Sequence, residues 1–411
     1  MSYPDKEDPE VLKALLPSLL TLPDGKSVID LEYLRQKVWR ETSSFVLPPE
    51  SVLRGMQANI FKILLKNEGG DERSIVIKRI YPGELPKKQN EDVLLDFIES
   101  VRREVIFYKD FLSHTEDSIA HLIPKIYEIL TNYNENEVVR DPMSMNSLII
   151  MSDMSDKYYQ RPAMNEQEAK VVLKNVAEFH AFYWNRLPKK AERGSFWVLE
   201  RRLTTGELEE TEVKRSWTAL LNRLPMIRQE CSNLTGLENL ASILCSKALE
   251  LDKFIQEGCV TRIHGDLKGW NLFLSTEEAL LIDMQWTGKG HPLQDVAYVL
   301  TTSLDSSCLP QMNNLVDYYI EELSKYLGDK SLNYSTLRSQ FDLVWCDYVR
   351  VIVTGIWKKL TLQSMESNKE KIGPSMINRS IKHVLFIIKR LHGLIIEKDI
   401  LDSIIFRDFR L

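Results

Sequence analysis

The chain has 411 residues, and its hydrophobic content of 44% provides enough apolar material for two packed lobes and too much for extended disorder. The formal net charge of −6 argues against nucleic acid as the main partner, because binding to a phosphate backbone depends on clustered Lys and Arg. The five cysteines include no C-x-x-C pair, which disfavours a disulfide framework and a zinc site and fits a reducing compartment.

The two ends of the chain show no pattern for export or membrane insertion. Residues 1–10 lack the cationic start and the apolar run of a secretory signal, and they are rich in acidic residues. The apolar stretch at 383–396 is interrupted by Lys389 and Arg390, whereas a membrane span needs roughly 18 apolar residues in succession. We therefore expect a cytoplasmic protein with no membrane partner.

The first third of the chain has the pattern of an antiparallel sheet combined with a helix. β-like runs at 51–66 and 74–80 flank a turn sequence at 67–71. From 92 to 112, apolar residues recur at steps of three and four, which predicts a helix. A further apolar strand at 147–151 ends this sheet-rich region.

The remainder of the chain is mainly helical. Helical periodicity is found at 166–184, 210–224, 237–256, 315–327, 337–360 and 380–394. Short strand-like runs interrupt this pattern between residues 258 and 290. We therefore predict an α+β fold with two lobes and a cleft, in which the second lobe carries a strand–loop insert. The expected domains are an N-terminal helical extension at 1–45, a first lobe at 46–156 and a helical second lobe at 157–411.

The most informative segment runs from His264 to Asn271 and is followed by Asp283. Phosphoryl transfer needs few protein groups, because positioning and metal ions stabilise most of its transition state. Asp266 is suited to orient an attacking hydroxyl and to accept its proton, while Asn271 and Asp283 supply oxygen ligands for Mg²⁺. A polar turn between two strands is the alternative, but it does not explain why acid, amide and acid follow one another beside apolar strands.

Two other residues of this segment have candidate roles. Lys268 lies two residues after Asp266, where a cation could reach the migrating phosphoryl group and neutralise its developing charge. A solvent-exposed loop lysine is the alternative. His264 adjoins the end of the apolar strand at 261–263, and we interpret it as a structural histidine that fixes the loop rather than as a general base.

Lys78 and Glu104 form a candidate pair in the first lobe. On the predicted helix, Glu104 shares a face with apolar residues, and a carboxylate in such surroundings needs a partner. Lys78 lies on a strand, and a Lys–Glu pair would hold its ammonium against the nucleotide phosphates. In the alternative interpretation, Glu104 pairs at the surface with Arg103 or Lys109, and Arg79 is the functional cation.

Two further segments are candidates for nucleotide contacts. Gly55 is a single glycine ahead of the Lys78 strand, where a phosphate-covering loop would lie, although an ordinary turn has the same pattern. Ser152, Asp153 and Met154 follow an apolar strand and could offer backbone groups to an adenine ring. The polar residues that follow any strand would give a similar sequence pattern.

With these residues identified, the chain resembles the aminoglycoside-phosphotransferase and choline-kinase superfamily, and within it the ecdysteroid-kinase-like group. The resemblance covers roughly residues 50 to 360 and depends on short motifs, namely Lys78 in V-x-K, Glu104 before Phe107-Tyr108, Pro124-Lys-Ile-Tyr127, Ala177-Glu-Phe-His-Ala181, His264-Gly-Asp266 with Asn271, Ile282-Asp-Met-Gln285 and Asp295-Val-Ala-Tyr298. It implies a protein-kinase-like fold with an antiparallel-sheet N-terminal lobe. It also implies that Asp295 is a structural carboxylate bracing the catalytic loop, and that His180 is a packed helix residue near it.

Together, the residues and the resemblance predict a kinase that transfers the γ-phosphate of ATP to a hydroxyl of a small metabolite, with Mg²⁺. A protein kinase and a catalytically silent nucleotide-binding scaffold are the alternatives. Eleven residues, Met284 to Gln294, separate Asp283 from Asp295. This link is too short for the peptide platform of a protein kinase, which favours a small acceptor.

Overall fold

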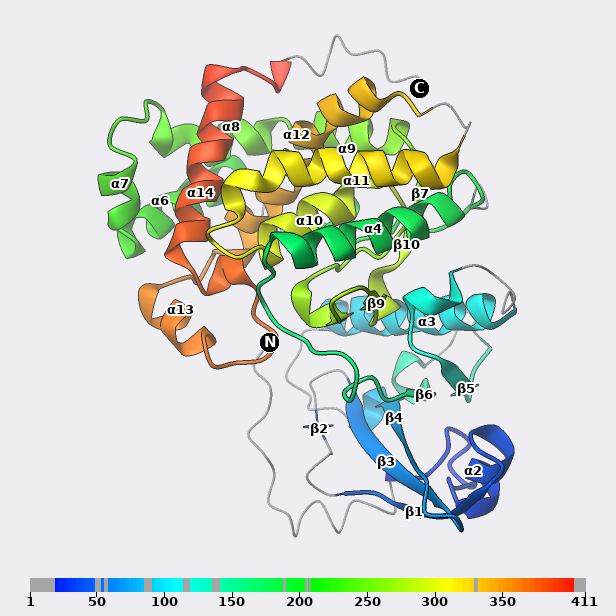
Figure 1. The fold of residues 1–411 in the computed structure, drawn as a ribbon. Coiled ribbons are helices and arrows are strands. Elements are labelled where there is room, and N and C mark those ends of the chain that lie inside the picture. The colour runs from blue at the N-terminus through cyan, green and yellow to red at the C-terminus, as the bar shows by residue number, and fades with distance from the viewer. Residues whose placement is uncertain are drawn as a thin grey trace. The chain divides into compact units, whose positions relative to one another are not determined.

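The computed structural model describes residues 19–48, 53–54, 58–84, 91–113, 119–134, 141–187, 190–203, 206, 208–328 and 332–402. It divides into two compact units, drawn as ribbons in Figure 1. The first unit comprises Met1–Tyr159 with Leu280–Gln285, and the second comprises Gln160–Ala279 with Trp286–Leu411. The division after Tyr159 lies close to the boundary predicted at 156, whereas residues 280–285 group with the first unit.

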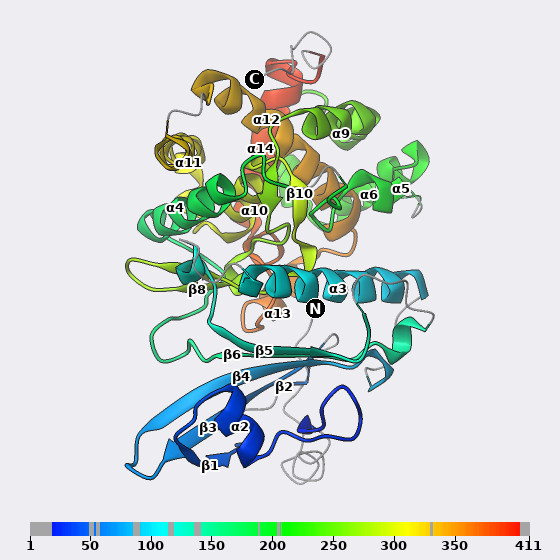
Figure 2. The same ribbon diagram turned by 90° about the vertical axis from the view of Figure 1, so that its right-hand side faces the viewer.

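The first unit is built on an antiparallel sheet. Its strands are ordered β1 (Thr42–Val46), β3 (Asn59–Asn67), β4 (Glu72–Ile80), β6 (Ser147–Ser152) and β5 (Ile126–Thr131), and the short β2 (Leu53–Arg54) pairs with β3. Side chains alternate between the faces of a strand, and β3 accordingly buries Phe61, Ile63 and Leu65 on one side. Helix α2 (Leu31–Lys37) contacts β1 and adds Leu34 to the same core (Figure 2).

Helix α3 (Glu91–Ser113) confirms the helix predicted at 92–112. It packs beside β5 in the first unit (Figure 2) and buries Val101, Val105 and Tyr108. Glu104 lies on this buried face, and only 1% of its surface is exposed. The apolar periodicity that forms the helix therefore also carries a carboxylate into the interior, where it needs a cationic partner.

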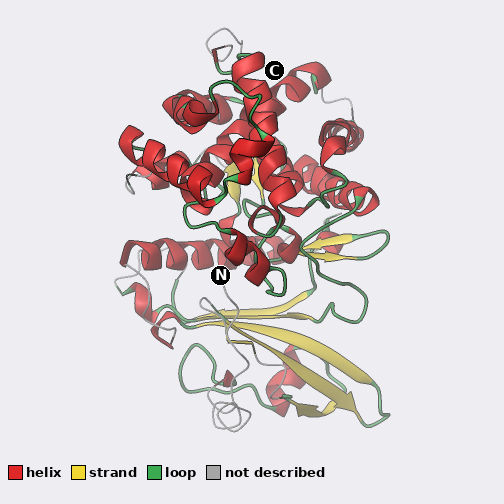
Figure 3. Ribbon diagram, turned by 90° about the vertical axis from the view of Figure 1, so that its left-hand side faces the viewer, coloured by secondary structure: helices red, strands yellow, loops and turns green. Residues whose placement is uncertain are grey.

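The second unit is mainly helical, as the red ribbons of Figure 3 show. Its α-helices are α4 (Glu166–Phe182), α5 (Leu199–Leu203), α6 (Glu210–Arg223), α7 (Met226–Glu230), α8 (Leu240–Ser246), α9 (Ala248–Glu257), α10 (Leu293–Ser303), α11 (Met312–Leu327), α12 (Tyr334–Val351), α13 (Leu362–Asn368) and α14 (Ile381–His392). The helix predicted at 237–256 is divided, because α8 ends and α9 begins at Lys247. The helix predicted at 337–360 ends at Val351 and continues as a π-helical turn, Ile352–Ile356.

Short strands form the predicted insert. They are β7 (Thr261–Ile263), β8 (Leu272–Leu274), β9 (Ala279–Leu281) and β10 (Gly288–Gly290). Within the second unit, β10 pairs with β7 in an antiparallel arrangement. The catalytic-looking segment from His264 to Asn271 therefore connects β7 to β8 and ends in a short 3-10 helix, Gly269–Asn271.

Helix α10 lies at the centre of the second unit. All of its residues from Leu293 to Ser303 are buried, and it contacts α11 and α12. Helix α11 in turn packs along α4 (Figure 1). A helix enclosed on all sides is held rigidly by its neighbours, so polar side chains at its N-terminal end are fixed in place.

These two units confirm the predicted α+β, protein-kinase-like fold class, with an antiparallel sheet in the first unit and mainly helices in the second. Within the described part of the chain, no helix is both long and apolar enough to span a bilayer. β1 crosses the predicted boundary between the N-terminal extension and the first lobe at residue 45.

Candidate active site

Asp295, in the first turn of α10, holds the loop that follows β7. Its Oδ2 accepts a hydrogen bond from the backbone N–H of His264 at 2.6 Å, and its Oδ1 accepts one from the backbone N–H of Gly265 at 2.9 Å. His180 Nε2 lies 3.1 Å from the same carboxylate. Burial alone would raise the pKa of Asp295, but these interactions outweigh it and lower that pKa. Asp295 therefore stays ionised and braces the loop, as the resemblance implied.

Gly265 permits the close approach of the backbone on which this loop depends. Its φ of +81° is in the left-handed region, and a Cβ there would overlap the carbonyl oxygen of Trp286 and lie 2.5 Å from the backbone nitrogen of Ser195. We expect Gly265→Ala to cost about 1–2 kcal/mol for the backbone conformation and about 1–3 kcal/mol more for the overlap.

Gly70→Ala is the matched control, because Gly70 also has a positive φ, of +87°, but no atom lies within 4 Å of the position that its Cβ would take. Thermal unfolding followed by circular dichroism measures both variants. Gly265→Ala should lower the midpoint clearly more than Gly70→Ala. Equal shifts would mean that the loop and its neighbours move apart easily, and that the close approach does not constrain the site.

Asp266 is held at both carboxylate oxygens. Oδ1 accepts a hydrogen bond from the Tyr298 hydroxyl at 2.7 Å, and Oδ2 accepts bonds from Lys268 Nζ at 2.7 Å and Asn271 Nδ2 at 3.0 Å. Asn271 Nδ2 also donates to the backbone carbonyl of Asp266 at 2.8 Å. The structure thus brings Asp266, Lys268 and Asn271 together in one loop. Only 5% of the Asp266 surface is exposed, so few solvent molecules compete for its oxygens.

The amide group of Asn271 has a fixed orientation. Its amide nitrogen is engaged with two oxygens of Asp266, which fixes the orientation of the amide. Within the described residues, no donor bonds to the remaining amide oxygen. A buried amide oxygen of this kind is a suitable hard ligand for Mg²⁺.

Lys78, Glu104 and Asp283 meet in the first unit. Lys78 Nζ lies 2.7 Å and 2.9 Å from the two Glu104 oxygens and 2.7 Å from Asp283 Oδ1. Burial opposes the charge on Lys78, but the two carboxylates outweigh it and raise the pKa of the ammonium. Burial raises the pKa of Glu104, and Lys78 opposes this effect. The predicted Lys–Glu pair therefore forms, and Asp283 joins it.

The alternative partners are engaged elsewhere. The Arg79 guanidinium lies over the Tyr81 ring, 3.5 Å from its centroid, and Lys109 Nζ donates to Thr131 Oγ1 at 3.4 Å. These contacts favour Lys78 over Arg79 as the cation associated with Glu104.

Asp283 has an unusual backbone. Its φ is +65°, in the left-handed region that non-glycine residues seldom occupy. The next residue, Met284, donates its backbone N–H to Glu104, and Gln285 Nε2 donates to Asp283 Oδ2 at 3.2 Å. About 25% of the Asp283 side chain is exposed, in contrast to 1% for Glu104. Strained residues often occur at functional sites, and Asp283 is the member of this cluster that a ligand can reach most easily.

We expect Lys78→Met to raise the KM for Mg-ATP, and Glu104→Gln to have a smaller effect in the same direction, because Glu104 acts through Lys78. The double variant should show little loss beyond that of Lys78→Met. Steady-state kinetics of the four proteins in a double-mutant cycle make this measurement. Strictly additive losses would indicate separate roles for the two residues, and Arg79 would be the next cation to test.

Ser152 and Asp153 are tied into the first unit. The backbone N–H of Ser152 donates to the carbonyl of Lys125 at 2.8 Å, and the Lys125 N–H donates to Ser152 Oγ at 3.0 Å. Asp153 Oδ2 pairs with Lys62 Nζ at 2.5 Å and accepts from Ser74 Oγ at 2.8 Å. Both side chains are therefore used within the unit, and nucleotide contacts here would come from main-chain groups.

The remaining predicted nucleotide contacts are Met154 and Gly55. The Met154 carbonyl accepts backbone hydrogen bonds from Lys157 at 3.2 Å and Tyr158 at 3.0 Å, which form a turn directly after β6. Gly55 lies outside the described residues.

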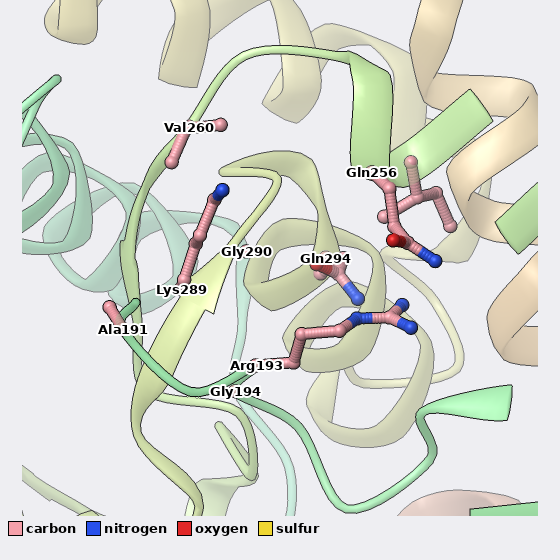
Figure 4. A pocket seen from close by; sticks show the side chains of 9 residues that line it. Ala191, Arg193, Gly194, Gln256, Val260, Lys289, Gly290 and Gln294 are labelled. Atoms are coloured by element: carbon pink, nitrogen blue, oxygen red, sulfur yellow. The ribbon is translucent and has the colours of Figure 1, made fainter. Parts of the chain in front are cut away.

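A cavity of about 120 Å³ lies in the second unit, lined by residues that include Arg193, Gln256, Lys289 and Gln294 (Figure 4). It is smaller than the 300–1,000 Å³ or so that is typical of ligand pockets. Arg193 is engaged with Asp252 at 2.6 Å. None of the predicted site residues lines this cavity, so it is not the candidate active site.

Tyr298 is the site residue that sequence reasoning missed. Its hydroxyl is a direct partner of Asp266, whereas the sequence offers it only as the last residue of the Asp295-Val-Ala-Tyr298 motif. The helix α10 was not among the predicted helices; had it been, the spacing of three residues between Asp295 and Tyr298 could have indicated that both face the same loop.

The second unit carries a braced loop with an aspartate and an asparagine, and the first unit carries a buried Lys–Glu pair. Both features are typical of proteins with a kinase-like fold. The chain belongs to the ecdysteroid kinase-like family, whose model matches residues 56–334. It is the family that the sequence motifs predicted.

Solved structures with detectable similarity include a choline kinase from Cryptosporidium parvum Iowa II. It is 13% identical, with 92% of this chain and 99% of that chain covered and a TM-score of 0.48. An ethanolamine kinase from Plasmodium vivax is 14% identical, with 98% of this chain and 97% of that chain covered and a TM-score of 0.44. A search of curated proteins found no match.

Proposed function

We propose that the protein is a small-molecule kinase that transfers the γ-phosphate of ATP to a hydroxyl of a small metabolite, with Mg²⁺ and with Asp266 as the catalytic base. The observation that carries this proposal is the arrangement around Asp266. A nearly buried carboxylate is held by Lys268 and Asn271 in a loop that Asp295 braces. Membership of the ecdysteroid kinase-like family supports it.

Asp266 orients the acceptor hydroxyl and takes its proton. The acceptor oxygen forms a bond to the γ-phosphorus, the bond from that phosphorus to the β,γ-bridging oxygen breaks, and ADP leaves. The proton of the hydroxyl passes to the Asp266 carboxylate. Lys268, whose side chain is 25% exposed, is close enough to this carboxylate to neutralise charge on the phosphoryl group as it moves.

We further propose that Asn271 and Asp283 each supply an oxygen ligand to Mg²⁺. Mg²⁺ prefers oxygen ligands and typically takes one or two protein carboxylates together with substrate oxygens and water. Within the described residues there is no group of three or more His, Cys, Asp or Glu side chains that could hold a metal. When bound, the ion would neutralise the charge of the nucleotide phosphates.

Lys78 binds the nucleotide phosphates, and Glu104 holds its ammonium in place. The raised pKa of Lys78 keeps the ammonium charged at neutral pH, as phosphate binding requires. We further propose that main-chain groups at Ser152, Asp153 and Met154 contact the adenine ring, and that the segment around Gly55 covers the phosphates.

The acceptor is proposed to be a small molecule because the link before α10 offers little surface to a peptide. Residues 288–290 of that link form β10, which pairs with β7. The next residue, His291, donates its backbone N–H to Gln294 Oε1 at 2.8 Å. Because these hydrogen bonds hold the segment in place, it does not offer an extended surface on which a peptide substrate could bind. A protein kinase is the second candidate function, and a silent nucleotide-binding scaffold the third.

A thermal-shift experiment with Mg-ATP separates the scaffold from the other two functions when it is combined with a turnover assay. The full chain is incubated with Mg-ATP and a pool of hydroxylated metabolites, and mass spectrometry detects any compound that gains one phosphate. Stabilisation by Mg-ATP with phosphate gain in a metabolite supports the proposal. Stabilisation with neither phosphate gain in a metabolite nor hydrolysis of ATP would favour the scaffold.

A further inference from the structure

Helix α10 contacts the loop after β7 at two points. Asp295 accepts hydrogen bonds from the backbone of His264 and Gly265, and Tyr298 donates to the Asp266 side chain at 2.7 Å. Residues three apart on a helix lie on the same face. One turn of a buried helix thus holds both the backbone of the loop and the carboxylate that the loop presents.

The Tyr298 ring is enclosed by other aromatic rings of the second unit. It stacks on Trp197, with ring centroids 4.9 Å apart and an interplanar angle of 21°. Tyr348 packs edge-on, with ring centroids 4.7 Å apart. The centroid of the Phe196 ring lies 5.7 Å from that of Tyr298. With 5% of its surface exposed, the ring has little freedom to rotate away from Asp266.

The Tyr298 hydroxyl stays protonated and can therefore donate its hydrogen bond to Asp266. Burial raises its pKa well above the ordinary value, and the nearby charge of Asp266 raises it further. A hydroxyl in an aromatic cluster is costly unless it is hydrogen-bonded. Asp266 Oδ1 is the partner that offsets this cost, so the phenol and the carboxylate fix each other.

We propose that Tyr298 is a positioning residue for the catalytic base: it holds Oδ1 of Asp266 and thereby directs Oδ2 to the hydroxyl of the acceptor. This inference depends on the proposed function, in which Asp266 takes the proton. The other two partners of the carboxylate, Lys268 and Asn271, both bind Oδ2. Within the described residues, Tyr298 is the one side chain that holds Oδ1 by a hydrogen bond, so its loss leaves the carboxylate held at Oδ2 alone.

Tyr298→Phe tests this role, because it keeps the ring and removes the hydroxyl. We expect kcat to fall by about 10–100-fold, the range for a modest misplacement of a reacting group, while the KM for Mg-ATP stays within about twofold. Tyr348→Phe is the matched control. It removes a hydroxyl that interacts with the Tyr298 side chain but donates no hydrogen bond to Asp266 in the described structure, so it controls for a change in the aromatic cluster alone.

The assay uses Mg-ATP with whichever compound of the metabolite pool gains phosphate, and circular dichroism checks that both variants fold. In the Asp266→Asn background, Tyr298→Phe should cause no further loss of kcat, because no base remains to be positioned.

The outcomes distinguish this inference from the proposed function. If Asp266→Asn lowers kcat strongly but Tyr298→Phe behaves like Tyr348→Phe, the positioning role of Tyr298 is wrong and the proposed function stands. A rise in KM for Mg-ATP with unchanged kcat would also overturn the role. If the wild type transfers no phosphate, or Asp266→Asn is as active as the wild type, the proposed function fails and this inference fails with it.

Discussion

Asp266→Asn is expected to lower kcat by about 10²–10⁴-fold, the usual contribution of general-base assistance. Asparagine has nearly the same side-chain volume as aspartate and keeps an oxygen that can accept the hydrogen bond from Tyr298. It lacks the carboxylate that takes the proton. The KM for Mg-ATP should change little, because phosphate binding is assigned to Lys78. Asp266→Ala should lose at least as much activity, since it also releases Tyr298, Lys268 and Asn271 from their common partner.

Asp317→Asn provides the control for this prediction. Asp317 is a carboxylate of the same unit that pairs with Arg338 at 2.7 Å and lies on α11, outside the loop. This variant should retain wild-type kcat. A folded Asp266→Asn protein with the same turnover as Asp317→Asn would remove Asp266 from the mechanism.

Asp283→Ala is expected to abolish magnesium-dependent turnover more completely than Asn271→Ala. A charged ligand lost from Mg²⁺ is harder to replace with water than a neutral one, so excess Mg²⁺ should partly rescue Asn271→Ala but not Asp283→Ala. Asp283→Ala also deprives Lys78 of one partner, but Glu104 still holds the ammonium at 2.7 Å. Both variants are therefore expected to fold.

The measurement is a titration of turnover with Mg²⁺ at saturating ATP for the wild type and the two variants. Gln285→Ala serves as a control for local disturbance, since Gln285 donates to Asp283 Oδ2 but has no assigned role at the metal. If Asn271→Ala and Asp283→Ala both titrate like the wild type, neither residue is a ligand.

Periodicity predicted the elements that bury one apolar face. It found α3, because Val101, Val105 and Tyr108 recur at helical spacing. The β-like runs at 51–66 and 74–80 indicated β3 and β4. It did not predict the division at Lys247 between α8 and α9, because the apolar pattern continues through a residue whose backbone leaves the helix. Local pattern is insensitive to such a break when both sides face the same core.

The candidate site was predictable where the chemistry requires particular residues close together in the sequence. Asp266, Lys268 and Asn271 lie within one short loop, and the structure brings their side chains into contact. Glu104 and Lys78 could be paired because a carboxylate on an apolar helix face needs a cation. Tyr298 could not be assigned to Asp266 in the same way, because its partner depends on how α10 packs against the loop.

The most direct test of the central proposal is the fate of labelled phosphate. The full chain and its Asp266→Asn variant are each incubated with Mg²⁺ and γ-labelled ATP, once with a pool of hydroxylated metabolites and once with generic protein substrates. The proposal predicts that the wild type transfers label to a small compound, that protein substrates stay unlabelled, and that Asp266→Asn transfers little to either. Robust labelling of the proteins with none in the metabolite pool would contradict it and favour a protein kinase.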